Sequence, residues 1–267
     1  MRLKITHTTS YSYDQPLHYA LLQLRLTPRD GHGQRVYSWS SHVTGATPQV
    51  SFIDHFRNHV DLVLMDEAAQ KIEITCTGEV ETEDRNGVLG QDKGHAPLWL
   101  FLQKTAVTTP GAAVRKLVKG LEGDVATDTL AAMHRLSELV GEAVAYEKGV
   151  TTAATTAEEA LAGGKGVCQD HAHVMIAAAR QLGVPARYVS GYLMLQGMDQ
   201  QEAAHGWAEV HVGALGWVGF DVSNAICPDE RYVRVAVGRD YGEAAPVHGL
   251  RHGSAKEELY VSLQVQQ

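Results

Sequence analysis

Residues 163–193 read GGKGVCQDHAHVMIAAARQLGVPARYVSGYL, and this stretch decides the fold of the second half of the chain. A glycine-rich loop leads into helix formers from Cys168 to Leu182 and, after Gly183, into a strand that begins at Ala186. The pattern places Cys168 in the first turn of a helix. There the unpaired backbone N–H groups and the positive end of the helix dipole stabilise a thiolate, and they can donate to an oxyanion on an attacked carbonyl.

Residues 203–224 read AAHGWAEVHVGALGWVGFDVSN, which predicts two strands joined by a Gly-Ala-Leu-Gly turn. If His211 pairs with Trp217, Asp221 lies on the face of His205 and diagonal to it, at roughly 7–8 Å between backbone positions. A slip of one residue would move Asp221 to the other face. The register is therefore a prediction that coordinates can test.

Thiol acyl transfer requires a nucleophile, a base and a residue that orients the base. Cys168, His205 and Asp221 follow one another in that order along the chain. Each alone has a structural explanation, because the chain has 14 histidines and acidic residues are common where strands end. Together with the helix-start position of the cysteine, they favour a catalytic triad.

Three further residues are predicted to bind the substrate: Asp170, Trp207 and Tyr192. For Asp170 two interpretations stay open, since a carboxylate in the first helical turn either caps the helix or faces the substrate. The other two cysteines, Cys76 on a predicted strand and Cys227 before a proline, are interpreted as structural.

The first part of the chain alternates apolar and polar residues, as in RLKITHTT, HVDLVLM and KIEITCTGEV. This period predicts a β-sandwich or open barrel of about six or seven strands up to about Val80. The periodicity fades over residues 81–110 and is followed by helical patterns. We therefore expect an α+β protein in which residues 1–105 form an all-β domain and residues 106–267 a catalytic domain.

Composition limits the class of protein. The 267 residues are 44% hydrophobic and 20% charged, which is enough apolar material for a sizeable core. A net charge of −8 argues against nucleic acid or an anionic membrane as the principal partner. No run approaches the roughly 18 apolar residues of a spanning helix, and the start lacks the apolar stretch of a signal peptide, so we expect a cytoplasmic protein. Three scattered cysteines argue against a disulfide framework.

A metal site is one alternative interpretation of the same region. Helical geometry argues against its simplest form, because positions 171 and 173 point about 200° apart and only Cys168 and His171 share a face. The candidate ligands would be Cys168, His171, His173, His205, His211 and Cys227.

The motifs GVCQDHA (166–172), HGWAE (205–209) and GFDVS (219–223) resemble those of the transglutaminase-like superfamily of papain-like cysteine enzymes. The similarity extends over about residues 154–242 and includes GVPARYVSGY (183–192) and VAVGRDY (235–241). The β-rich half resembles the amino-terminal domain that accompanies this module in a bacterial and archaeal branch. The resemblance implies a helix that carries the cysteine, packed on an antiparallel sheet that carries the histidine and aspartate.

The resemblance also implies the roles of the residues. Cys168 would be the nucleophile, His205 the general base and acid, and Asp221 the residue that orients the imidazole, with no metal or other cofactor. The sequence departs from the usual pattern at Gly206, where Ala or Thr is common, and at 222–223, where Val-Ser replaces Pro-Thr. No residue in the sequence is identified as the second oxyanion donor.

The implied reaction is attack of a thiolate on an amide carbon, followed by transfer of the acyl group to water or to an amine. Water makes the protein a peptidase or amidase, which we favour because the chain has no calcium-loop pattern such as DxDxDG. An amine makes it a protein-glutamine transglutaminase. A binding module that keeps the fold without chemistry is the remaining alternative. The expected partner is a peptide, protein or small amide substrate.

Overall fold

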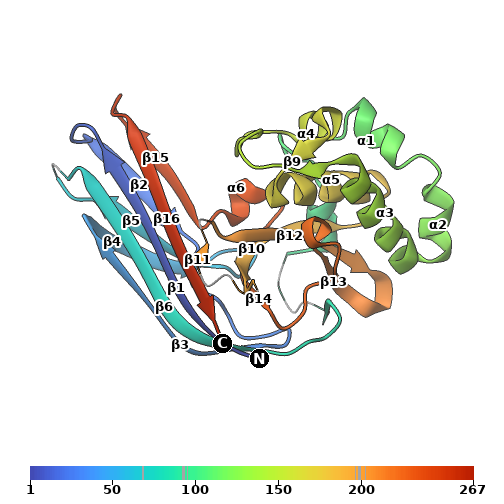
Figure 1. Cartoon of the computed structure of the whole chain (residues 1–267), viewed down its shortest axis with the longest axis horizontal. Helices are drawn as coiled ribbons and strands as arrows, with labels where there is room; N and C mark the ends of the chain where they lie inside the picture. The colour runs from blue at the N-terminus through green and yellow to red at the C-terminus, as the bar shows by residue number, and fades with distance from the viewer. Residues whose placement is uncertain (68, 92–93, 95, 196, 198–199, 202) are drawn as a thin grey trace.

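The computed structural model describes residues 1–267 except 68, 92–93, 95, 196, 198–199 and 202. Its elements form two bodies, a sandwich of antiparallel sheets and a five-stranded sheet with helices on one face (Figure 1). The predicted α+β class is confirmed. No helix among the described residues is long and apolar enough to cross a membrane.

The sandwich consists of two sheets, with strand orders β11-β16-β1-β6-β3 and β15-β2-β5-β4. Along the first strand Leu3 and Ile5 are buried and their neighbours Arg2 and Lys4 are exposed, so the period-two pattern places one face in the core. The strands are β1 (Arg2–Tyr13), β2 (Tyr19–Leu24), β3 (Gln34–Thr44), β4 (Ala46–Ile53), β5 (His59–Met65), β6 (Lys71–Thr82), β11 (Gln200–Gln201), β15 (Val247–His252) and β16 (Glu257–Gln266).

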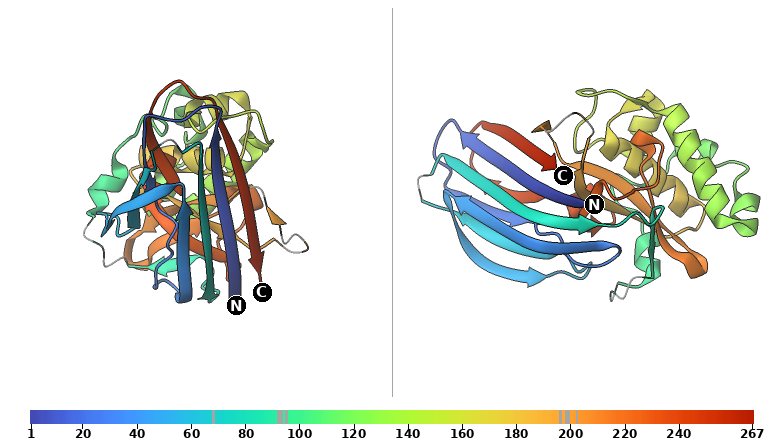
Figure 2. Two further views of the ribbon diagram at one scale, coloured as in Figure 1. Left: turned by 90° about the vertical axis from the view of Figure 1, so that its left-hand side faces the viewer. Right: turned by 60° about the horizontal axis from the view of Figure 1, so that its bottom comes forward.

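The last two strands return to the sandwich. β16 pairs with β1, with Gln266 opposite Lys4, and β15 pairs with β2. The two chain ends consequently lie side by side (Figure 2). The predicted division at residue 105, with all of 106–267 in the catalytic domain, is therefore wrong for residues 247–266. The alternating pattern of residues 257–266 is enough to identify β16 as a strand, but it does not identify its partner, because β1 lies more than 200 residues away in sequence.

The second body is built on a sheet of order β14-β10-β12-β13-β7. Its strands are β7 (Val88–Gly90), β10 (Ala186–Leu193), β12 (His205–Val212), β13 (Gly216–Phe220) and β14 (Tyr232–Gly238), and a separate pair is formed by β8 (Ala145–Tyr146) and β9 (Lys165–Gly166). The helices are η1 (Leu98–Leu102), α1 (Ala112–Leu117), α2 (Glu122–Thr127), α3 (Thr129–Ala143), α4 (Ala157–Gly163), α5 (Cys168–Gln181), η2 (Gly213–Leu215), η3 (Val222–Asn224) and α6 (Tyr241–Ala244).

Helix α5 is the central element of this body. It packs against the sheet on one side and against α1, α3 and α4 on the other, and every residue from Asp170 to Arg180 is buried (Figure 1). A helix enclosed on all sides has little freedom to shift, so the position of its first turn is fixed. Helix α4 leads up to it. Thr156 and Glu159 form a capping box at its start, and Gly164 ends it in the left-handed conformation.

Strands β12 and β13 form the predicted hairpin. His211 lies opposite Trp217 and Ala208 opposite Phe220, which is the register expected from the sequence. The face that carries Ala208 and Val210 belongs to the core under α5. The opposite face of the sheet carries Trp207 and packs against Phe56, which lies between β4 and β5 of the sandwich.

Candidate active site

Cys168 is the first residue of α5 and is partly exposed, whereas the helix behind it is buried. The two residues of β9 precede it and pair in parallel with β8. Gly166 in β9 has no room for a side chain, because a Cβ there would lie 2.6 Å from the Cβ of Asp170. The glycine-rich approach is thus required for the chain to enter the helix at this angle, and the thiol lies at the start of α5 as predicted.

Asp170 caps the helix. Its Oδ2 accepts hydrogen bonds from the Val167 backbone N–H and from the Thr151 hydroxyl, each at 2.7 Å. The side chain is buried, so it does not face the solvent from which a substrate would approach. Of the two interpretations left open by the sequence, the structure shows the cap.

His205 and Asp221 are hydrogen-bonded, with 2.6 Å between Nε2 and Oδ2. His205 begins β12, and Asp221 follows the last residue of β13. The same Oδ2 accepts from Asn224 Nδ2 and from the Tyr232 hydroxyl, each at 2.7 Å. Burial opposes the ionised carboxylate, but the hydrogen bonds and the charge of His205, with those of Asn224 and Tyr232, hold the pKa of Asp221 below its usual range.

The other side of the imidazole faces Cys168. Because Nε2 is occupied by Asp221, the nitrogen left for the thiol is Nδ1. Burial lowers the pKa of His205, but hydrogen bonds and charge from Asp221 and Cys168 outweigh it and raise this pKa to about 10. The imidazole is therefore held in its protonated form beside the Asp221 carboxylate, with Cys168 on its other side. The structure thus brings Cys168, His205 and Asp221 together.

Two of the predicted substrate-binding residues lie elsewhere than expected. Trp207 is 3% exposed and stacks on the His205 ring at 6.2 Å, so it contacts the base and has little surface for a substrate. Tyr192 is 1% exposed, is hydrogen-bonded to His7 in the sandwich, and is wrong as a substrate contact. Tyr192 packs instead with Leu3 and Ile5 of the sandwich, beyond the part of β10 that α5 covers.

The residues proposed for a metal site have other partners. His171 uses both ring nitrogens, one with the Ser223 hydroxyl and one with the Val144 carbonyl, each at 2.7 Å. His173 accepts from the Tyr241 backbone N–H, and burial lowers its pKa to about 4. Within the described part of the chain, no three His, Cys, Asp or Glu side chains gather as a metal site would require.

The matches to known sequence families agree with this geometry. Residues 115–222 match the Transglutaminase-like superfamily, and residues 3–81 match the Bacterial transglutaminase-like N-terminal region. The core of the chain, residues 115–222, belongs to the transglutaminase-like superfamily. The matched core contains all three of the residues that meet at the start of α5.

Similar proteins extend the comparison. An uncharacterized protein of Mycobacterium leprae is 28% identical over 99% of this chain and 98% of its own length. An uncharacterized protein of Mycobacterium bovis is 37% identical over 43% of this chain and 40% of its own length. A solved structure from Cytophaga hutchinsonii, described as a candidate cysteine protease, has a TM-score of 0.77 and 22% identity, covering 100% of this chain and 91% of that one. The last match shows a shared fold.

The departure of this chain from the superfamily pattern at Gly206 has a structural reason. A Cβ at this position would lie 2.0 Å from the hydroxyl oxygen of Tyr188, which extends from β10 under the start of β12. The Tyr188 ring is held between His173 and Tyr241, at 5.4 and 5.9 Å between ring centres. A large phenol on one strand thus occupies the space of the small side chain on the next.

Phenols around Cys168 are the feature that sequence analysis missed. Tyr146 in β8 is opposite Gly166 and is 52% exposed. Burial raises the pKa of Tyr146, Tyr188 and Tyr241, and the negative charge of Cys168 raises each further. These hydroxyls stay protonated and are hydrogen-bond donors. Tyr188 and Tyr241 lie in the stretches 183–192 and 235–241, but the sequence does not relate them to each other or to Tyr146, because the three come from separate elements.

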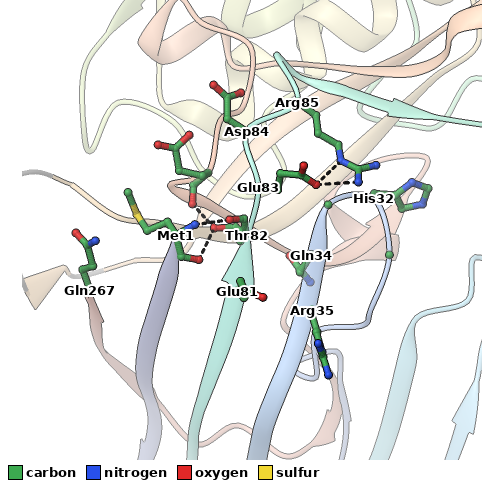
Figure 3. A pocket seen from close by; sticks show the side chains of 13 residues that line it. Met1, His32, Gln34, Arg35, Glu81, Thr82, Glu83, Asp84, Arg85 and Gln267 are labelled. Atoms are coloured by element: carbon green, nitrogen blue, oxygen red, sulfur yellow. Dashed lines mark hydrogen bonds and ion pairs between the residues drawn. The ribbon is translucent and has the colours of Figure 1, made fainter.

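Two of the surface hollows bear on where a substrate could bind. One of about 1020 Å³ is at the end of the sandwich beside both termini, between Met1, Arg35 and Arg85 (Figure 3). None of the triad residues lines it. Another of about 570 Å³ lies beside the approach to Cys168, and it is lined by Val150, Thr151, Thr152, Ala154, Thr155, Glu159, Ala160, Gly163 and Lys165.

Proposed function

We propose that this protein is a cysteine-dependent acyl-transfer enzyme that cleaves amide bonds, with Cys168 as nucleophile, His205 as base and acid, and Asp221 as the orienting residue. One observation carries the proposal. The His205 imidazole is hydrogen-bonded through Nε2 to Asp221 and turns its other nitrogen toward the thiol at the start of α5. This is the arrangement that a thiol nucleophile needs.

The reaction proceeds in two halves. The Cys168 thiolate attacks the amide carbon, and the first backbone N–H groups of α5 are donors for the oxyanion. The His205 imidazolium then gives its proton to the leaving amine as the C–N bond breaks, which leaves a thioester. In the second half His205 takes a proton from water, the hydroxide attacks the thioester carbon, and the C–S bond breaks to release an acid and restore the thiolate.

Water is the acceptor we favour. The groove of about 570 Å³ reaches to Lys165, three residues before Cys168, and is lined mainly by threonine and alanine. Such a neutral polar groove suits a peptide backbone. The side chain of Gln169 donates to the Ala153 carbonyl and ties this groove to the first turn of α5. A peptidase or amidase is therefore the first candidate, with a transglutaminase and an inactive binding module as the alternatives.

The decisive experiment needs no substrate. The alkylation rate of each cysteine by iodoacetamide is measured at pH 6 by mass spectrometry, in the natural protein and in His205→Ala. We expect Cys168 to react at least tenfold faster than Cys76 and Cys227, and to lose this advantage without His205. Three thiols of equal, slow reactivity would refute an activated nucleophile and favour a binding module.

Acceptor choice is tested next. Peptide amides are incubated with the protein with and without a primary amine such as methylamine. Release of a free acid supports hydrolysis, and an amine adduct that replaces the acid supports a transglutaminase. The Cys168→Ala variant is the control for both products.

A further inference from the structure

Asp221 shares one oxygen among three donors. His205 Nε2, Asn224 Nδ2 and the Tyr232 hydroxyl all reach Oδ2, at 2.6, 2.7 and 2.7 Å. The carboxylate is 1% exposed, so water does not compensate for the loss of any of them. The mechanism above uses only the bond to His205, and the motif at 235–241 covers the end of the strand of Tyr232 but not Tyr232 itself.

Tyr232 reaches the triad from a distant part of the sheet. Tyr232 is the first residue of β14, which is an edge strand of the sheet and pairs with β10. β14 therefore does not pair with β12 or β13, the strands that carry His205 and lead to Asp221. The Tyr232 ring lies 5.9 Å from that of His205 and meets Trp207 edge-on at 5.4 Å. The His205 imidazole therefore has Trp207 on one side and Tyr232 on another, and Tyr232 also contacts the residue that orients it.

We propose that Tyr232 is a positioning residue for His205, whose hydroxyl shares the Asp221 oxygen and thereby limits how tightly the carboxylate holds the imidazolium proton. The inference rests on the proposed function, since it concerns the proton that His205 must return to the leaving amine. A carboxylate oxygen with three donors spreads its charge among them. Removal of one donor leaves more of that charge to His205.

The hydroxyl remains a donor over the whole accessible pH range. Burial and the negative charge of Asp221 raise the pKa of Tyr232 far above its usual value. The imidazolium needs the carboxylate for its orientation. An imidazolium that the carboxylate holds too firmly is, however, a weak acid and transfers its proton slowly. Three donors on one oxygen therefore balance orientation against release.

Few other titratable groups face this cluster. Cys168 faces His205 from α5, and Asp229 and Arg231 lie beside Tyr232 in the loop before β14. Tyr146 and Tyr188 lie within the reach of the Asp221 charge. Asp229 is paired with Arg231 by a hydrogen-bonded ion pair, so the two charges largely cancel at Tyr232.

The test measures the titration of His205 in a background without the thiol. The ring resonances of His205 are followed by NMR against pH in Cys168→Ala, and are assigned by their loss in Cys168→Ala/His205→Gln. In Cys168→Ala/Tyr232→Phe we expect the midpoint to rise by about 0.5 to 1 pH unit, a three- to tenfold increase in proton affinity. A purely structural role for the phenol would not raise it.

The control is Tyr192→Phe in the same background, which removes a buried phenol that is bonded to His7 instead of Asp221. It should leave the midpoint unchanged. If Tyr232→Phe fails to fold, Asn224→Ala removes another donor from the same oxygen and should raise the midpoint in the same direction. An unchanged or lower midpoint, or an equal rise in the control, overturns the proposal. Because Cys168→Ala has no nucleophile, this result does not depend on whether the enzyme is active.

Discussion

Gly206 is the position where a single methyl group should matter most. In Gly206→Ala the new Cβ would lie 2.0 Å from the Tyr188 hydroxyl oxygen and 2.7 Å from its Cζ, whereas ordinary contacts begin at 3.4 Å. The phenol would have to move by about 1.4 Å, the difference between 3.4 and 2.0. It cannot do so freely, because Tyr188 is buried and packed against His173 and Tyr241.

We therefore expect Gly206→Ala to lower the free energy of unfolding by about 1–3 kcal/mol, which is the usual cost of overpacking. Gly206 follows the base His205 directly, so a forced backbone shift should also disturb the triad. A displacement of about 1 Å can reduce a rate about 100-fold. Urea denaturation measures the first effect, and the alkylation rate of Cys168 at pH 6 measures the second.

Two further variants test whether the clash with Tyr188 is the cause. In Gly123→Ala the Cβ meets no atom within 4 Å inside helix α2, so stability should rise by about 0.5–1 kcal/mol. Adding Tyr188→Phe to Gly206→Ala removes the closest atom and should recover part of the loss. If Gly206→Ala is as stable as the natural protein, or if Tyr188→Phe recovers nothing, the explanation of this glycine is wrong.

Three other predictions follow from the same structure. Cys168→Ala should abolish turnover and leave the urea midpoint almost unchanged, as the thiol is partly exposed. Asp221→Asn should slow Cys168 alkylation at pH 6 at least tenfold, because in the natural protein this carboxylate keeps the His205 imidazole protonated up to about pH 10. The control Asp229→Asn should not slow it. Burial lowers the pKa of His7 to about 4, so the unfolded chain takes up the proton first. The contribution of His7 to the free energy of unfolding should fall by about 3 kcal/mol as the pH drops from about 6.5 to 4, and His7→Gln should remove this part of the pH dependence in urea titrations.

Local patterns were sufficient for the parts of the site that depend on neighbours in sequence. The helix from Cys168 follows from a glycine-rich entry and a run of helix formers. The meeting of His205 with Asp221 follows from the register of one hairpin, since pairing of adjacent strands fixes every side chain on one face or the other. The capping box at Thr156 is equally local.

Other features depended on contacts between distant segments. The return of β16 to β1 could not be predicted, because strands that are distant in sequence are paired by the whole fold and not by their own pattern. Tyr192 was misplaced because its neighbours, such as His7 and Leu3, come from β1, more than 180 residues away in sequence. Tyr232 was missed because the first residue of an edge strand has no periodic signal for contact with a triad.

Short-range properties of the chain, such as helix starts, strand alternation and hairpin register, were enough to predict the fold class, the superfamily and the meeting of Cys168, His205 and Asp221. The surroundings of these three residues depend on the tertiary structure. The hydroxyl of Tyr232 on Asp221, the phenol of Tyr188 over Gly206 and the stacking of Trp207 on His205 come from elements separated in sequence. These contacts form only when the sheet packs against α5, because burial then brings together groups whose proximity no local sequence pattern predicts.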